Sequence, residues 1–152
     1  MKKILILFIA FFIGVRSFAN IPPNIDEKLI HSFQLAFPNA REVSWYEGAE
    51  TYQVYFEEGD IKTRISYWKD GLYVQFLRYY RERNLPSYIQ FRVKKEYPGK
   101  TISSITELSS ISGPENEIKV EYNIKMEDAK TWITVRVDAN GYLKVIEKFR
   151  KA

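Results

Sequence analysis

The sequence has 152 residues but no cysteine, and it contains a single histidine, His31. Without thiols it has no disulfides, no thiolate metal ligands and no cysteine nucleophile. It also lacks a glycine-rich phosphate-binding loop and any readable nucleophile–base spacing. We expect His31 on the solvent side of a helix, which makes it a poor candidate for a general base. The sequence therefore predicts a protein that is not an enzyme and uses no metal or cofactor.

Long apolar runs are absent except at the N-terminus. Lys2 and Lys3 precede the twelve apolar residues 4–15, and the small residues Ser17 and Ala19 follow. This pattern predicts a signal peptide over residues 1–19 with cleavage after Ala19. We therefore expect a periplasmic or secreted protein without a membrane span after cleavage. An uncleaved N-terminal anchor is the alternative.

An excess of basic charge is also missing once the signal peptide is removed. The full chain carries 23 lysines and arginines against 19 acids, and three of these bases lie in residues 1–19. Residues 20–152 therefore have a net charge of only +1. We expect no nucleic-acid partner, because such proteins usually present strong positive charge.

An amphipathic helix is predicted near the start of the expected mature chain. Leu29, Phe33 and Phe37 recur at helical spacing, so they form one apolar stripe. We expect Phe33 to pack against Trp45 between this helix and the sheet. Asn24 and Glu27 have the spacing of a capping box. Pro38 ends the pattern.

The same order of patterns recurs about sixty residues later. Ile89, Val93 and Tyr97 form a second stripe, and Pro98 follows it. Each half then alternates like strands joined by short turns. The expected strands are 41–47, 50–57, 60–68, 72–80, 101–108, 117–127, 130–137 and 142–149, with residues 109–117 read as a loop.

The fold predicted from these patterns is α+β, with two tandem helix-plus-four-strand repeats over residues 20–83 and 84–152. The antiparallel sheet would carry its helices on one face. Chance similarity between two strand-rich halves is the alternative to duplication.

The segment from Tyr67 to Tyr80 contains six aromatic residues around Asp70-Gly71. A two-residue turn there would pair Trp68 with Tyr73 and Ile65 with Phe76, and it would keep the core face apolar. A three-residue loop, which places Tyr73 opposite Tyr67, is the less favourable alternative. With the first register, the helix-free side of the first half carries Tyr46, Tyr55, Arg64, Trp68, Tyr73, Leu77 and Tyr79.

These seven residues are the predicted partner-binding site. Tyrosine, tryptophan and arginine are enriched at binding hot spots. Mutual stacking of tyrosines within the sheet is the structural alternative.

The helix-free side of the second half is predicted to be charged, with Trp132 as its one large aromatic residue. The sequence Asp138–Gly141 suits a type I turn followed by a bulge. That turn would pair Val137 with Leu143 and Val135 with Val145.

The chain resembles the PepSY-like, β-lactamase-inhibitor-like proteins exported by Bacteroides-type bacteria. The motif residues that support the resemblance are Phe37-Pro38-Asn39-Ala40, Val43, Trp45, Tyr52, Val54, Phe56 and Asp70-Gly71. The resemblance implies tandem helix-plus-four-strand units with an open sheet face for a protein or peptide ligand. In that family the inhibitor uses an aromatic sheet face and an acidic loop residue to occupy the substrate site of an enzyme. Here the acidic turn residues are Glu47, Glu50, Glu58 and Asp60.

Together, these patterns predict an exported, non-catalytic module that binds an unidentified protein or peptide and is a monomer or weak dimer. Inhibition or regulation of an envelope or secreted enzyme, such as a protease, is the specific hypothesis. The alternative is a structural, envelope-associated protein whose aromatic face is buried by self-association.

Overall fold

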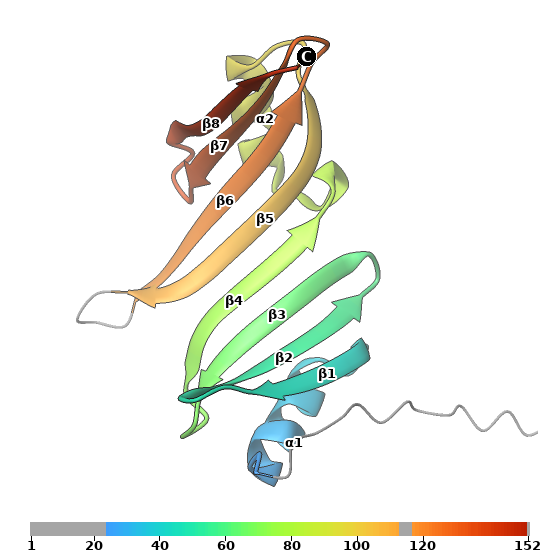
Figure 1. Cartoon of the computed structure of the whole chain (residues 1–152), viewed down its shortest axis with the longest axis vertical. Helices are drawn as coiled ribbons and strands as arrows, with labels where there is room; N and C mark the ends of the chain where they lie inside the picture. Colours follow the sequence, from blue (N-terminus) through green and yellow to red (C-terminus); the bar gives the residue numbers. More distant parts are fainter. Residues whose placement is uncertain (1–23, 113–116, 152) are drawn as a thin grey trace, which may run out of the picture.

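The structure, a computed structural model, describes residues 24–112 and 117–151. These residues form two α-helices, one short 3₁₀ helix and one antiparallel sheet of eight strands in chain order (Figure 1). The elements are α1 (Glu27–Ala36), β1 (Arg41–Glu47), β2 (Thr51–Glu58), β3 (Ile61–Trp68), β4 (Tyr73–Tyr80), η1 (Glu82–Asn84), α2 (Ser87–Glu96), β5 (Thr101–Ser112), β6 (Glu117–Glu127), β7 (Thr131–Asp138) and β8 (Leu143–Arg150). The predicted signal peptide and its cleavage after Ala19 lie outside the described residues.

The start of α1 differs from the capping-box prediction. Asp26 is the N-cap, and its carboxylate accepts a hydrogen bond from the Lys28 N–H at 2.8 Å. Asn24 therefore does not cap the helix. Its backbone carbonyl accepts a hydrogen bond from the Tyr52 hydroxyl at 2.7 Å, which ties the residues before the helix to β2.

The first hydrophobic core lies between α1 and strands β1–β3. Leu29 and Phe33 of the helix are buried against Trp45, Val54 and Ile65. The Phe33 and Trp45 rings meet edge to face, with centroids 5.4 Å apart. This contact was expected from the sequence. Such a pair contributes beyond its buried area because the edge of one ring faces the π-surface of the other.

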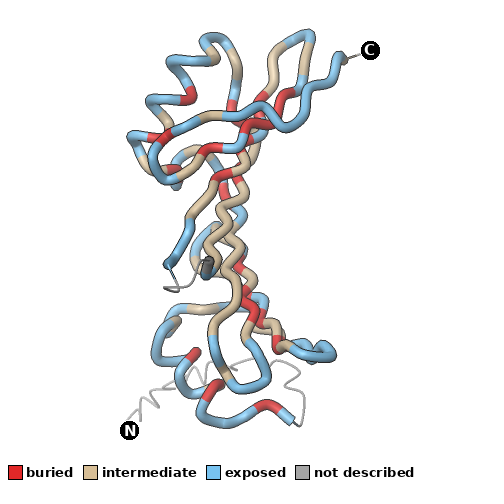
Figure 2. Tube along the Cα trace, turned by 90° about the vertical axis from the view of Figure 1, so that its left-hand side faces the viewer, coloured by how far each residue is buried: buried red, intermediate tan, exposed pale blue. Residues whose placement is uncertain are grey.

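The second core lies between α2 and strands β5–β7. Ile89 and Val93 are fully buried against Ile105, Ile124 and Val135. In Figure 2 the buried residues gather toward the two ends of the sheet, whereas the strands between them are mostly of intermediate burial. The helical stripes predicted from sequence therefore face two separate cores.

Both helices pack on the same face of the sheet. Phe76 contacts the first core and Tyr80 belongs to the second, and residues four apart in β4 point to the same side. Strands β4 and β5 pair without a bulge from Gln75–Ser110 to Tyr80–Ile105. This pairing makes one continuous sheet of the two halves.

The loop between β3 and β4 has three residues rather than the predicted two. The Trp68 N–H donates to the Leu72 carbonyl at 2.8 Å, and the Gly71 N–H donates to the Trp68 carbonyl at 2.9 Å. Gly71 has φ +88°, a left-handed conformation that favours glycine. Residues 69–71 therefore form the loop, and the prediction of a two-residue turn was wrong.

A bulge in β4 then restores the expected pairing farther along the hairpin. Tyr67 pairs with Tyr73, whereas Ile65 pairs with Phe76, so Val74 is the extra residue. The Ile65–Phe76 pair agrees with the sequence prediction. Tyr73 does not, because the longer loop turns its side chain to the helix-covered face.

The second half follows its predicted hairpin register. Val137 pairs with Leu143 and Val135 with Val145. Strand β5 is longer than expected, since it runs to Ser112 instead of ending at Leu108. Its serine-rich end was read as a loop, but β6 pairs with it throughout.

Candidate functional site

The face of the sheet opposite the helices, here called the open face, is the candidate site. In the first half it is formed by side chains that alternate with those of the core. Tyr55 of β2, Arg64 of β3 and Leu77 of β4 lie in one row across the strands. Six of the seven predicted site residues are on this face: Tyr46, Tyr55, Arg64, Trp68, Leu77 and Tyr79.

Tyr55 is the centre of the aromatic group. The Tyr46 ring meets it edge to face at 5.2 Å between centroids. The Tyr55 hydroxyl donates to the Gln53 side-chain oxygen at 3.1 Å, and it accepts a long hydrogen bond of 3.4 Å from Arg64 Nη1. The guanidinium carbon of Arg64 lies 5.9 Å from the Tyr55 ring centroid. These contacts hold a cation beside the Tyr55 ring, which in turn packs against the Tyr46 ring.

Arg64 has no acidic partner within the part of the chain that the structure describes. Its Nε atom is buried without a hydrogen bond, and no other buried side-chain nitrogen or oxygen among the described residues lacks one. A buried donor without an acceptor costs about 1–3 kcal/mol. The Arg64 side chain, at the centre of the first half of the open face, therefore has a buried hydrogen-bond donor without an acceptor.

Trp68 and Tyr46 present large aromatic surfaces to solvent. Trp68 is 43% exposed at the end of β3, as the sequence predicted, and Tyr46 is 57% exposed. Trp68 lies four residues from Arg64 on the same strand face, a separation of about 13 Å. Tyr79 is also exposed, opposite Lys62. The exposed aromatic surface therefore extends over all of the first half.

Tyr73 has a structural position instead. It packs beside the first core, and its hydroxyl donates to the Ser109 carbonyl at 2.9 Å. Burial raises the pKa of Tyr73, partly offset by that hydrogen bond. Tyr73 thus helps to join β4 to β5 on the helix side and is removed from the candidate site.

Leu108 belongs to the open face but was missed in the sequence. It pairs directly with Leu77 across β4 and β5, and so it extends the face into the second half. Alternation within β5 could have placed Leu108 on one face of the sheet. Its contact with Leu77 could not be predicted, because it depends on the register between the two halves.

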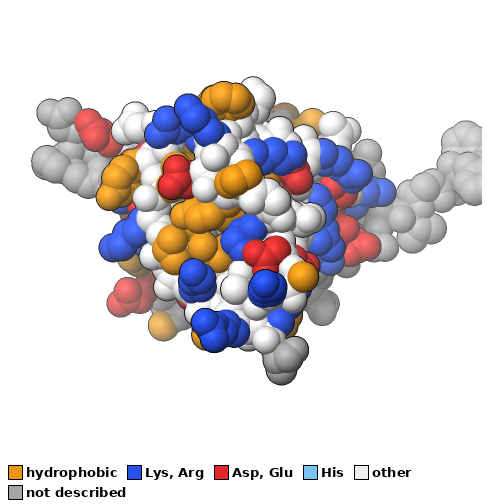
Figure 3. All heavy atoms as spheres, turned by 90° about the horizontal axis from the view of Figure 1, so that it is seen from above, with side chains coloured by type: hydrophobic (Ala, Val, Ile, Leu, Met, Phe, Trp, Pro, Cys, Tyr) orange, Lys and Arg blue, Asp and Glu red, His pale blue; other side chains and the backbone are white. Residues whose placement is uncertain are grey.

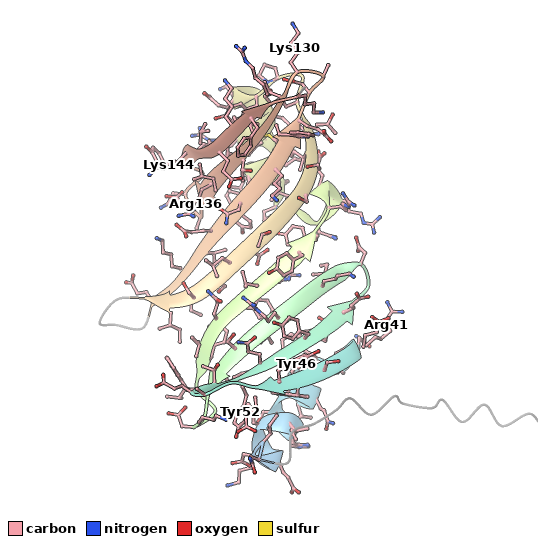
Figure 4. The ribbon with its side chains drawn as sticks, in the orientation of Figure 1. Arg41, Tyr46, Tyr52, Lys130, Arg136 and Lys144 are labelled. Atoms are coloured by element: carbon pink, nitrogen blue, oxygen red, sulfur yellow. The ribbon has the colours of Figure 1, made fainter. Side chains whose placement is uncertain are left out.

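The open face of the second half is predominantly polar and charged. Trp132 donates from its indole N–H to Glu127 at 2.8 Å, and Lys151 Nζ lies 5.0 Å above its ring. Arg136 Nε donates to the Asn123 side-chain oxygen at 3.3 Å. Arg136 and Lys144, which are paired residues of β7 and β8, lie far from Tyr46 along the sheet (Figure 4). Figure 3 shows many lysines and arginines around hydrophobic side chains at this end of the molecule.

The tyrosines whose pKa values are strongly raised lie on the helix-covered side of the sheet. Burial raises the pKa of Tyr67 to about 12, with a smaller effect of Tyr73. Burial, followed by the nearby Glu107 carboxylate, raises the pKa of Tyr122 to about 12. Both side chains pack in or against the cores. Their shifts therefore reflect burial in the fold.

Metal-binding clusters and membrane-spanning helices are both absent from the described ranges. No three histidine, aspartate or glutamate side chains there are grouped as metal ligands. No helix in residues 24–112 and 117–151 has the length and apolar character needed to span a bilayer.

Several solved structures from Bacteroides share this architecture. A BLIP-like protein from Bacteroides fragilis is 12% identical, with a TM-score of 0.58 over 86% of this chain and 87% of its own. A DUF2874 family protein from Bacteroides ovatus is 13% identical, with a TM-score of 0.59 over 87% and 89%. A protein from Bacteroides eggerthii that is provisionally assigned to the periplasm is 14% identical, with a TM-score of 0.54 over 82% and 88%.

No protein-family model and no curated protein matches the sequence. The likeness is therefore one of fold, and it extends over most of the chain. The protein has the fold of the BLIP-like and DUF2874 proteins of Bacteroides.

Proposed function

We propose that this protein is an exported, non-catalytic module that binds a protein or peptide through its open face. The observation that carries the proposal is the group of exposed aromatic residues beside Arg64 on a sheet face that no helix covers. A soluble protein rarely exposes large contiguous apolar patches without a partner. Tyrosine, tryptophan and arginine are also the residue types that dominate binding hot spots. The proposed contact residues are Tyr46, Tyr55, Arg64, Trp68, Leu77 and Tyr79.

Export is supported by the N-terminal sequence and by one fold neighbour. Residues 1–19 have the pattern of a signal peptide, and the Bacteroides eggerthii protein is provisionally assigned to the periplasm. In this proposal residues 20–83 and 84–152 are tandem PepSY-like repeats that arose by duplication. The order of one helix and four strands in each half supports this origin.

Inhibition or regulation of an envelope or secreted enzyme, such as a protease, is the specific role that we propose. One fold neighbour is a BLIP-like protein, and the resemblance found in the sequence implies a sheet face that occupies another protein. The side chains gathered on the open face suit contact with a protein surface, since aromatic rings bury much area with little loss of side-chain entropy.

Self-association is a second candidate, favoured by the edge strand β8. Val145, Ile146 and Phe149 are all exposed on this strand, which lies at the end of the sheet. An exposed apolar edge strand can pair with a second chain. In that case the protein would be an envelope-associated structural protein whose aromatic face is buried in the assembly.

The test uses the protein as bait in envelope extract, followed by affinity measurements with the partner that it captures. Trp68→Ala and Tyr46→Ala should each weaken binding, by about 2 kcal/mol for Trp68, which is a typical hot-spot loss. Their urea midpoints should stay near wild type, since both side chains are exposed.

Phe91→Ala is the matched control, because Phe91 is an exposed aromatic residue of α2 on the helix side. It should leave the affinity unchanged. Loss of binding with Phe91→Ala but not with Trp68→Ala would refute the open face as the site. Analytical ultracentrifugation distinguishes the second candidate, which requires a stable dimer that Trp68→Ala or Phe149→Ala dissociates.

A further inference from the structure

We infer that the open face recognises an acidic side chain, and that Arg64 is the residue that binds its carboxylate. The partner would be a protein or peptide segment that places an aspartate or glutamate beside Arg64, between Tyr55 and Leu77. This inference rests on the proposed binding role of the open face. It adds the chemistry of the partner and the residue that selects it.

The first argument is the incomplete hydrogen bonding of the Arg64 guanidinium, whose Nε is the one buried side-chain nitrogen or oxygen without a partner among the described residues. Arg78 pairs with Glu107 at 3.5 Å, and Arg83 pairs with Asp60 at 2.5 Å. On the open face itself, Arg136 donates to the Asn123 oxygen. Arg64, in contrast, makes one long hydrogen bond to a tyrosine hydroxyl and leaves its Nε without an acceptor.

The second argument is the surroundings of this cation. A guanidinium binds a carboxylate through two parallel N–H groups, and it does so best where water is excluded. The Tyr55 ring is 5.9 Å from the Arg64 guanidinium carbon, and Leu77 is its neighbour on the other side. A partner that covers these apolar groups would remove water from the ion pair and so strengthen it.

The third argument is the lack of competition within the chain. The nearest basic residue along the same strand face, Lys62, is already paired with Glu57 at 3.1 Å. No described carboxylate lies within 4 Å of Arg64. Because Nε is buried, the donors available for a carboxylate from outside the molecule are those of the two Nη groups. An amide or hydroxyl would fill the same space but would lack the charge.

The probe for this inference is a phage-displayed library of random linear peptides, selected on the full-length protein. Selected peptides should share an aspartate or glutamate at one fixed position. Replacing that acid by asparagine or glutamine should weaken binding about ten- to a hundredfold, because a hydrogen-bonded charge pair is lost.

The decisive measurement is a double-mutant cycle between the peptide acid and Arg64. With Arg64→Gln, peptide affinity should fall by a similar factor, and removing the acid should then have little further effect. Arg64→Lys should recover only part of the affinity, since it keeps the charge but not the planar fork. The matched control Arg136→Gln, on the same face, should bind like wild type.

A stability measurement separates recognition from folding. Arg64→Met removes a buried nitrogen that has no hydrogen-bond partner, so its urea midpoint should equal or exceed that of wild type. A large drop in midpoint would show that the guanidinium is structural and would overturn the inference.

The outcomes also separate this inference from the proposed function. Peptides that lose affinity with Trp68→Ala but show no acid preference, or no coupling to Arg64, would leave the binding face standing and overturn the carboxylate site. If no peptide binds, or if binding ignores both Trp68 and Arg64, the proposed face and the inference fail together.

Discussion

At the scale of single residues, the two sides of α1 give opposite expectations for stability. Phe33 is buried and contacts the rings of Phe37, Trp45 and Phe56. His31, on the other side of the helix, is exposed. Phe33→Ala should lower the free energy of unfolding by about 3–5 kcal/mol, as large-to-small core changes do. His31→Ala should change it by less than about 0.5 kcal/mol.

Urea unfolding of the two variants measures this difference. The dependence of the unfolding free energy on urea concentration should be the same in both, which shows that the unfolded state is unchanged. Equal losses of unfolding free energy in both variants would show that Phe33 and His31 do not lie on opposite sides of α1.

At the scale of elements, the β6–β7 turn is held by the carboxylate of Asp128. It accepts hydrogen bonds from the backbone N–H groups of Lys130 and Thr131 at 2.8 and 2.7 Å and pairs with Lys100. The Lys100 contact, followed by these backbone N–H groups, holds the pKa of Asp128 well below its usual 3.8. In the unfolded chain the carboxyl would take up its proton at higher pH than in the folded protein.

This turn should therefore lose stability as the pH falls, because the unfolded state binds protons first. The contribution of Asp128 is fully present at neutral pH and decreases below about pH 5. Asp128→Asn should thus lower the urea midpoint at pH 7, and the difference from wild type should shrink by pH 3. Glu50→Gln, which changes an exposed acid in the β1–β2 turn, is the charge control. A difference that stays constant with pH would assign the effect to turn geometry instead.

At the scale of the whole molecule, two cores share one sheet. Strands β4 and β5 pair over six residues, and Tyr73 and the Arg78–Glu107 pair add contacts across the same junction. The exposed edge and the unpaired groups that separation would create make independent unfolding of the halves costly. We therefore expect one cooperative transition for the chain.

Single-tryptophan variants test this expectation. Trp45 reports on the first core, and Trp132 reports on the second half. Within each variant, the urea midpoint by fluorescence should equal the midpoint of the whole sheet by circular dichroism. Adding Phe33→Ala should shift both reporters together. Two separate midpoints would show that the halves unfold independently.

Much of the fold could be predicted from the sequence because its signals are local. The spacing of Leu29 and Phe33, and of Ile89 and Val93, identified the buried sides of both helices. Alternation in β2 and β3 placed Tyr55, Arg64 and Trp68 on the open face. The loop at Asp138–Gly141 also gave the observed register of β7 and β8.

One wrong prediction, the β3–β4 turn, concerned a segment for which two local conformations were both reasonable. Asp70-Gly71 suited a two-residue turn, but the structure has a three-residue loop, and a bulge at Val74 compensates for the extra residue. The core requires Phe76 opposite Ile65. A two-residue turn would give this pairing directly, and the three-residue loop gives it together with the bulge. The two conformations differ in which face of the sheet Tyr73 occupies, and turn propensity alone does not decide that.

The sequence by itself determined which side chains alternate, which stripes are apolar and which chemistry is missing, because these properties depend on neighbours in the chain. The tertiary structure decided that β4 pairs with β5, that Leu77 meets Leu108, and that Arg64 keeps a buried Nε without a partner. These features depend on strand register and on packing between residues distant in sequence. Such contacts follow from the shape of the whole sheet, which no local pattern encodes.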